Sequence, residues 1–124
     1  MRVLLVEETP ELGGLWKNHL KLLGMDTSLV TNGEAALHKL RNYHPDIIVA
    51  NLDLPDAGAI SVADYAAYRY PETQVIFVTS STFFSDGSIF AMSPNACAFL
   101  SAHTPPEDLA AVIEYHAERR IRER

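Results

Sequence analysis

Five short apolar runs divide the chain, and within each run the apolar residues are consecutive rather than alternating with polar ones. They span residues 2–6, 26–30, 46–50, 74–79 and 97–100, of which the second is the weakest. Consecutive apolar residues are typical of strands covered on both faces, as in a parallel sheet. The pattern therefore predicts five buried parallel strands.

The first predicted helix lies between the first two runs. Thr9 is a candidate N-cap, Pro10 suits the first helical position, and Gly24 is expected to end the helix. The apolar residues at helical spacing within it are Leu12, Leu15, Trp16, Leu20 and Leu23. This spacing predicts one apolar stripe that packs on the sheet.

The other intervals also favour helices. They are predicted over about 32–40 and 60–68, and after Thr104, which forms a capping box with Glu107. The interval before the last strand contains Gly and Pro and allows only a short helix, about 86–92. Strand and helix thus alternate five times, which predicts an α/β fold with a doubly wound (βα)5 parallel sheet and helices on both faces.

Length and composition limit the classes of function. A chain of 124 residues with 48% hydrophobic residues is the size of one domain, with residues 118–124 as a helix end or the start of a C-terminal linker. The net charge of -6 argues against nucleic-acid binding, and the apolar runs are too short to span a membrane, so a cytoplasmic protein is expected. Cys97 stands among apolar neighbours and is expected to be a buried, unreactive residue.

Polar residues cluster where the predicted strands end, which is where ligands bind in such sheets. They are Glu7, Glu8, Asn51, Asp53, Thr79, Ser80, Ser101 and His103. An esterase-like site that pairs Ser80 or Ser101 with His103 is one interpretation, but the sequence offers it neither an oxyanion loop nor a buried acid.

Four motifs in order resemble the receiver domain of two-component response regulators, of the CheY type. They are VLLVEETP, PDIIVANLDLPDAG, VIFVTS and AFLSAHTPPEDL, and together they extend over nearly the whole chain. The resemblance implies a flavodoxin-like sheet with strand order 2-1-3-4-5. It also implies a role for each residue that matches a family motif.

The resemblance assigns Asn51 to the position of the phosphate-accepting aspartate, because that residue stands four positions before a proline, here Pro55. An amide cannot form an acyl phosphate, since its nitrogen lone pair is delocalised into the carbonyl. Asp53 is the alternative acceptor. The favoured hypothesis is that Asp53 caps backbone within its own loop.

Further departures concern the phosphate and metal ligands. Ala102 occupies the place of the family's lysine, and His103 follows it where the family has proline. The acidic pair is Glu7 and Glu8, with Glu8 in the place of the direct magnesium ligand, so no metal or other cofactor is expected beyond weak magnesium binding at Glu8. Loss of one aspartate and one lysine leaves the pocket charge at about minus two, so the fold is expected to tolerate both changes.

Thr79 and Phe99 match the family's switch residues, although simple packing explains both residue types. The sequence thus predicts a non-enzymatic, phosphorylation-independent receiver, or pseudo-receiver, that binds a protein partner or output domain in signal transduction. The alternative is an active phosphotransfer receiver that uses Asp53 or Glu8.

The partner surface is expected on the fourth helix, fifth strand and fifth helix, where a homodimer is also conceivable. No nucleic-acid or membrane contact is expected. The apolar candidates for this surface are Phe83, Phe84, Ile89, Phe90 and Met92.

Overall fold

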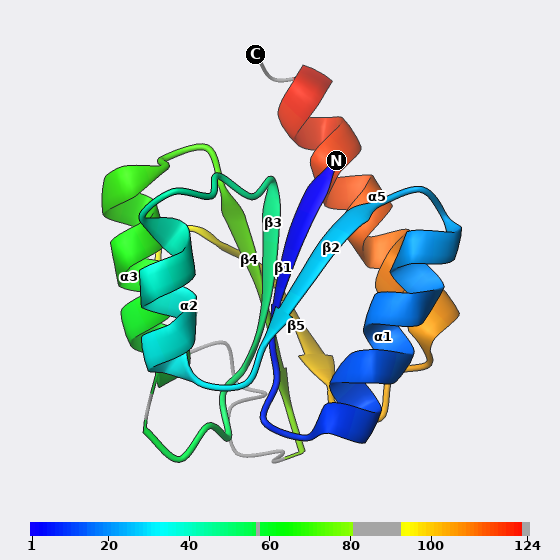
Figure 1. Ribbon diagram of the computed structural model, residues 1–124. Helices are drawn as coiled ribbons and strands as arrows, with labels where there is room; N and C mark the ends of the chain where they lie inside the picture. The colour runs from blue at the N-terminus through cyan, green and yellow to red at the C-terminus, as the bar shows by residue number, and fades with distance from the viewer. Residues whose placement is uncertain (57, 81–92, 123–124) are drawn as a thin grey trace.

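Five parallel strands form one sheet, with helices on both of its faces (Figure 1). The computed structural model describes residues 1–56, 58–80 and 93–122, with side chains to residue 119. The strands are β1 (Arg2–Val6), β2 (Asp26–Val30), β3 (Ile47–Asn51), β4 (Gln74–Thr79) and β5 (Ala96–Ser101). The helices are α1 (Pro10–Leu22), α2 (Gly33–Leu40), α3 (Gly58–Arg69) and α5 (Pro106–Arg122).

The strand order is β2-β1-β3-β4-β5, and each neighbouring pair is parallel, which confirms the predicted fold. Figure 1 shows α2 and α3 on one face of the sheet and α1 and α5 on the other. Because all strands run in the same direction, their carboxyl ends meet at one edge. The polar residues that follow the strands are therefore brought together there.

Two apolar clusters, one on each face, hold the layers together. Alternate residues of a strand point to opposite faces, so Leu4 and Val6 join the cluster beneath α2 and α3, whereas Val3 and Leu5 join the cluster beneath α1 and α5. Trp16, at 1% exposure, is among the largest fully buried side chains. Burial on both faces explains why β1, β3 and β4 contain long apolar runs, whereas most residues of the edge strands β2 and β5 are only partly buried, contrary to the prediction of five buried strands.

Some predicted details are corrected. Leu15 and Leu23 are 54% and 50% exposed, so the buried stripe of α1 is narrower than its apolar spacing predicts. The last helix begins at Pro106, one residue later than a capping box at Thr104 requires. The helix predicted over 86–92 and the apolar candidates between residues 83 and 92 lie outside the described residues. Residues 118–122 continue α5.

One carboxylate serves the first turns of two helices. Asp56 Oδ2 accepts a hydrogen bond from Gly33 N at the start of α2, and Asp56 Oδ1 accepts one from Gly58 N at the start of α3, both at 3.2 Å. A negative charge at a helix N-terminus is favourable because the free N–H groups there carry partial positive charge. A Cβ added at Gly33 would stand only 2.6 Å from Gly58 Cα, so both positions require glycine.

Within the described part of the chain, no helix combines the length and apolar character needed to cross a membrane.

Candidate functional site

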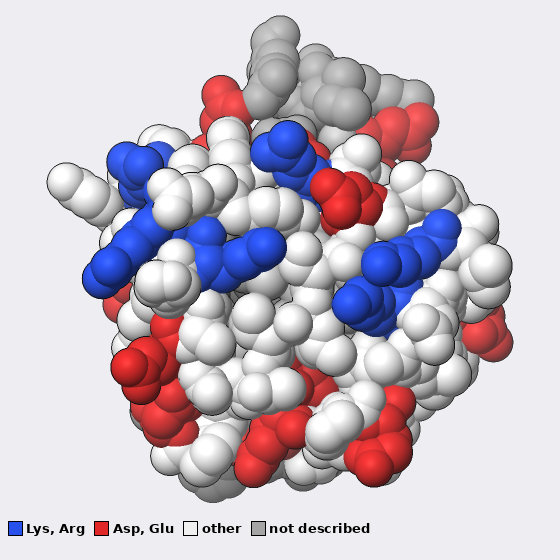
Figure 2. All heavy atoms as spheres, in the orientation of Figure 1, with Lys and Arg blue, Asp and Glu red and all other residues white. Residues whose placement is uncertain are grey.

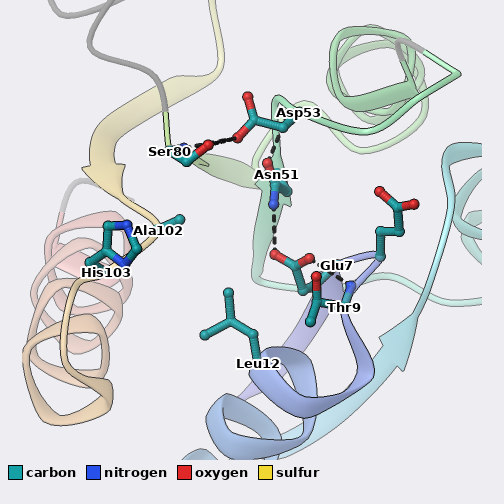
Figure 3. Close-up of a pocket in the computed structure, with 9 residues that line it drawn as sticks. Glu7, Thr9, Leu12, Asn51, Asp53, Ser80, Ala102 and His103 are labelled. Carbon is teal, nitrogen blue, oxygen red and sulfur yellow. Dashed lines mark hydrogen bonds between the residues drawn. The ribbon is translucent and has the colours of Figure 1, made fainter.

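The carboxyl ends of four strands border a hollow of about 320 Å³ (Figure 3). It is lined by Glu7, Glu8, Thr9, Leu12, Asn51, Asp53, Ser80, Ala102 and His103. The structure thus brings together most of the residues to which the sequence assigned a role. Thr79 and Phe99 are not among the lining residues.

A buried pair, Glu7 and Asn51, forms the floor of this hollow. Glu7 is 1% exposed and Asn51 is 8% exposed. Asn51 Nδ2 donates to Glu7 Oε1 at 2.7 Å, and Thr9 N donates to Glu7 Oε2 at 2.9 Å, so each oxygen of the carboxylate accepts a hydrogen bond. These bonds compensate for burying a charged group.

The amide oxygen of Asn51 is also engaged. Asp53 N donates to Asn51 Oδ1 at 2.7 Å, so the amide donates on one side and accepts on the other. An ionised aspartate at position 51 could still accept from Asp53 N but could not donate to Glu7. The hydrogen bond between Asn51 and Glu7 therefore depends on the amide of Asn51.

Asp53 bonds to the adjacent strand rather than to its own loop. Asp53 Oδ1 accepts from Thr79 Oγ1 at 2.8 Å, and Asp53 Oδ2 accepts from Ser80 N at 2.8 Å and from Ser80 Oγ at 2.9 Å. We call these three residues the Asp53 clamp. The sequence-based hypothesis of a cap within the loop is thus corrected, since the described bonds of this carboxylate tie the end of β3 to the end of β4.

The clamp favours the ionised form of Asp53. Partial burial raises the pKa of this carboxyl, but the donors of Ser80 and Thr79 outweigh burial and bring the pKa below its ordinary value. A lowered pKa means that ionised Asp53 stabilises the fold above the ordinary titration range of aspartate. This contribution is lost as the pH falls through the lowered pKa.

Ala102 and His103, which follow β5, form another side of the hollow. Ala102 is 8% exposed, and its backbone N donates to Thr79 O, whereas His103 is exposed. The backbone N of His103 donates to Ser101 Oγ at 3.0 Å, and Ser80 Oγ donates to Asp53. Neither of these two contacts joins a serine hydroxyl to the imidazole ring, so the described geometry gives no support to the esterase-like interpretation.

The hollow is strongly acidic. Its lining includes three carboxylates, from Glu7, Glu8 and Asp53, and none of its described lining residues is Lys or Arg. Asp53 thus adds a carboxylate that the sequence-based charge count left out. Figure 2 shows acidic side chains along the lower edge of the same view, where the carboxyl ends of the strands lie in Figure 1.

The donor set does not match a magnesium site, in which carboxylate oxygens face the metal in near-octahedral geometry. Both Glu7 oxygens accept hydrogen bonds, the Asn51 amide nitrogen faces Glu7, and the Asp53 carboxylate is turned to β4. Glu8, to which the sequence gave the ligand role, is exposed. Among the described residues, no group of three or more His, Cys, Asp or Glu side chains is arranged to hold a metal ion.

Three other residues singled out in the sequence, Thr79, Phe99 and Cys97, do not line the hollow. Thr79 is 2% exposed, and Phe99 is partly buried against the cluster beneath α2 and α3. Cys97 is partly buried, and burial raises the pKa of its thiol to about 12. A thiol with so high a pKa remains protonated at neutral pH and is a poor nucleophile.

A five-stranded sheet of this order with an acidic hollow at its carboxyl edge defines a receiver-like α/β domain. The family model for the response regulator receiver domain matches residues 3–114, and the chain belongs to this family. Receiver domains act in two-component signalling with kinases and output domains.

Similar proteins include longer bacterial regulators. Regulatory protein LuxO of Vibrio vulnificus strain YJ016 is 32% identical over 76 residues, which are 61% of this chain and 17% of LuxO. Response regulator protein PilR of Pseudomonas aeruginosa is 27% identical over 113 residues, which are 91% of this chain and 24% of PilR. The chain therefore spans less than a quarter of the length of either relative.

Solved structures agree with this assignment. The signal receiver domain of a putative LuxO repressor protein from Vibrio parahaemolyticus superposes with a TM-score of 0.86 at 27% identity, covering 98% of this chain and 93% of that chain. A CheY-like receiver domain from Methanospirillum hungatei JF-1 gives a TM-score of 0.89 at 21% identity, covering 99% and 98% of the two chains. The second likeness concerns the fold alone.

Proposed function

We propose that this chain is a degenerate receiver, or pseudo-receiver, that regulates a protein partner or an output domain without being phosphorylated. The observation that carries the proposal is the state of Asn51. Its amide stands at the end of β3, donates to Glu7 and accepts from Asp53 N. A neutral amide cannot serve as the nucleophile in phosphoryl transfer.

The alternative acceptor, Asp53, is a weaker candidate. Three donors already engage its two oxygens. Hydrogen bonds to an ionised carboxylate stabilise the ground state and so reduce its nucleophilicity. The hollow also lacks a lysine where the family has one, because Ala102 stands there, so an incoming phosphoryl group would meet carboxylates without a described cation in the lining.

The proposed domain is not an enzyme and requires no cofactor, and its magnesium affinity is expected to be weak because of the donor set described above. The proposed binding partner is a protein in the cytoplasm rather than a nucleic acid or a membrane. The similarity to the longer regulators LuxO and PilR is consistent with an output domain as that partner, and a second copy of the chain, bound through β5 and α5, is a further candidate.

Incubation with acetyl phosphate and magnesium, followed by intact mass spectrometry, tests the proposal. Wild type is expected to gain no phosphoryl mass. Asn51→Asp is expected to react poorly for want of a cation, and Asn51→Asp combined with Ala102→Lys is expected to react better. Labelling of wild type would overturn the proposal, and loss of that label in Asp53→Asn would identify the alternative acceptor.

A further inference from the structure

The Asp53 clamp has the composition of an occupied anion site. Two consecutive residues, Thr79 and Ser80, supply one N–H and two O–H donors, and all three donors point to a single carboxylate at 2.8–2.9 Å. Converging backbone and hydroxyl donors are a common means of binding an anion. Here the anion belongs to the chain itself.

We propose that the Asp53 carboxylate is a permanent internal ligand that holds the Thr79 hydroxyl toward the carboxyl edge of the sheet and so fixes the end of β4 in one state. Asp53 is thus a positioning residue. This inference rests on the proposed function, because in a domain that received a phosphoryl group that anion could compete with Asp53 for the same donors.

The position of Asp53 is itself determined by its neighbours. Asp53 N donates to Asn51 Oδ1, and Asn51 Nδ2 donates to the buried Glu7 carboxylate. Figure 3 shows this series of hydrogen bonds running from Thr9 through Glu7, Asn51 and Asp53 to Ser80. The amide at position 51 thus contributes to the clamp by orienting the first residues after β3.

An internal carboxylate also has an advantage over a free anion at this place. The lining carboxylates Glu7 and Glu8 repel an external anion, and the ionisable group on the opposite side of the hollow is the exposed His103. A ligand on the same chain has a high effective concentration and can be held despite this repulsion. The donors of β4 are therefore expected to remain occupied without any added ligand.

Backbone and side-chain NMR of the full chain tests the inference. In wild type, the Ser80 amide is expected to be protected from hydrogen exchange, and the Thr79 side chain is expected to occupy one χ1 rotamer. Asp53→Ala removes both acceptor oxygens and is expected to accelerate Ser80 exchange at least about tenfold and to allow Thr79 χ1 averaging. Asp53→Asn keeps one acceptor oxygen and is expected to give an intermediate result.

Asp64→Asn is the matched control, because Asp64 is an exposed acid on α3 outside the hollow. It is expected to leave both signals as in wild type. Averaged Thr79 rotamers in wild type, or equal Ser80 exchange in wild type and in both Asp53 variants, would overturn the inference. The acetyl phosphate assay remains separate, since phosphorylation of wild type would refute the proposed function whatever the NMR signals show.

Discussion

The contact between Asn51 and Glu7 allows a quantitative prediction about the missing aspartate. Asn51→Asp replaces the donor that lies 2.7 Å from Glu7 Oε1 with a carboxylate oxygen. Two unit charges about 3 Å apart repel by about 5 kcal/mol at an effective dielectric constant of about 20. The lost hydrogen bond to a charged group adds about 1.5–3 kcal/mol.

A shared proton limits this cost, as in other close carboxylate pairs. We therefore expect Asn51→Asp to lower the free energy of unfolding by about 3–4 kcal/mol at pH 7, which leaves a typical domain of about 5–15 kcal/mol folded. Urea unfolding should show a midpoint lower by about 2 M for an m-value of about 2 kcal/mol/M.

The loss of unfolding free energy in Asn51→Asp is expected to depend on pH. In the folded variant the two carboxylates repel each other at close range and a proton bound by the pair relieves this repulsion, whereas in the unfolded chain the two groups lie far apart. The folded variant then binds more protons than the unfolded one, so its stability relative to wild type falls as the pH rises. The difference from wild type should be small near pH 4 and largest above pH 7.

A second substitution provides the decisive control. In Asn51→Asp combined with Glu7→Gln, the new amide at position 7 can donate to the new carboxylate, while its oxygen still accepts from Thr9 N. The roles of amide and acid are exchanged, and most of the lost stability should return. If Asn51→Asp proves as stable as wild type at pH 7, or if the double variant is no more stable than the single one, the reasoning fails.

Two further predictions concern packing. Gly33→Ala should destabilise the fold by about 1–3 kcal/mol, because the added Cβ meets the backbone of the α3 start at 2.6 Å, whereas Gly14→Ala on α1, with nothing within 4 Å, should be neutral or stabilise it by up to about 1 kcal/mol. Thermal unfolding compares the two, and equal effects would contradict the glycine contact. The thiol of Cys97, whose pKa is raised to about 12, should react with a thiol reagent at pH 8 at least about a hundredfold more slowly than in urea, and similar rates would contradict its burial.

The fold could be predicted because its signal is repeated along the chain. Burial of both faces leaves the central strands β1, β3 and β4 rich in consecutive apolar residues, and the predicted bounds of β1, β2 and β4 agree with the structure. Helix ends were less accurate, since α3 begins at Gly58 rather than near residue 60. Helical spacing also could not show that Leu15 faces solvent, because apolar residues on an exposed face follow the same spacing.

The site was predicted in position but not in contacts. Strand ends identified Glu7, Asn51 and Asp53, yet the direction of the Asp53 side chain depends on how close the end of β4 lies, which spacing in the sequence does not reveal. The alternation of side chains along an extended chain predicts that Glu7 and Glu8 point to opposite sides, but not which of the two is buried. Glu7 continues the pairing of β1 through its N–H to Val30 O, and it is the buried member of the pair.

Asp56 has a consequence for how the domain opens. Its two oxygens accept from the first residues of α2 and α3, and the glycines at these starts are in close contact. A displacement of Asp56 would therefore remove an N-terminal acceptor from both helices at once. We therefore expect α2 and α3 to unfold and refold locally as a single cooperative unit, independently of α1 and α5 on the opposite face.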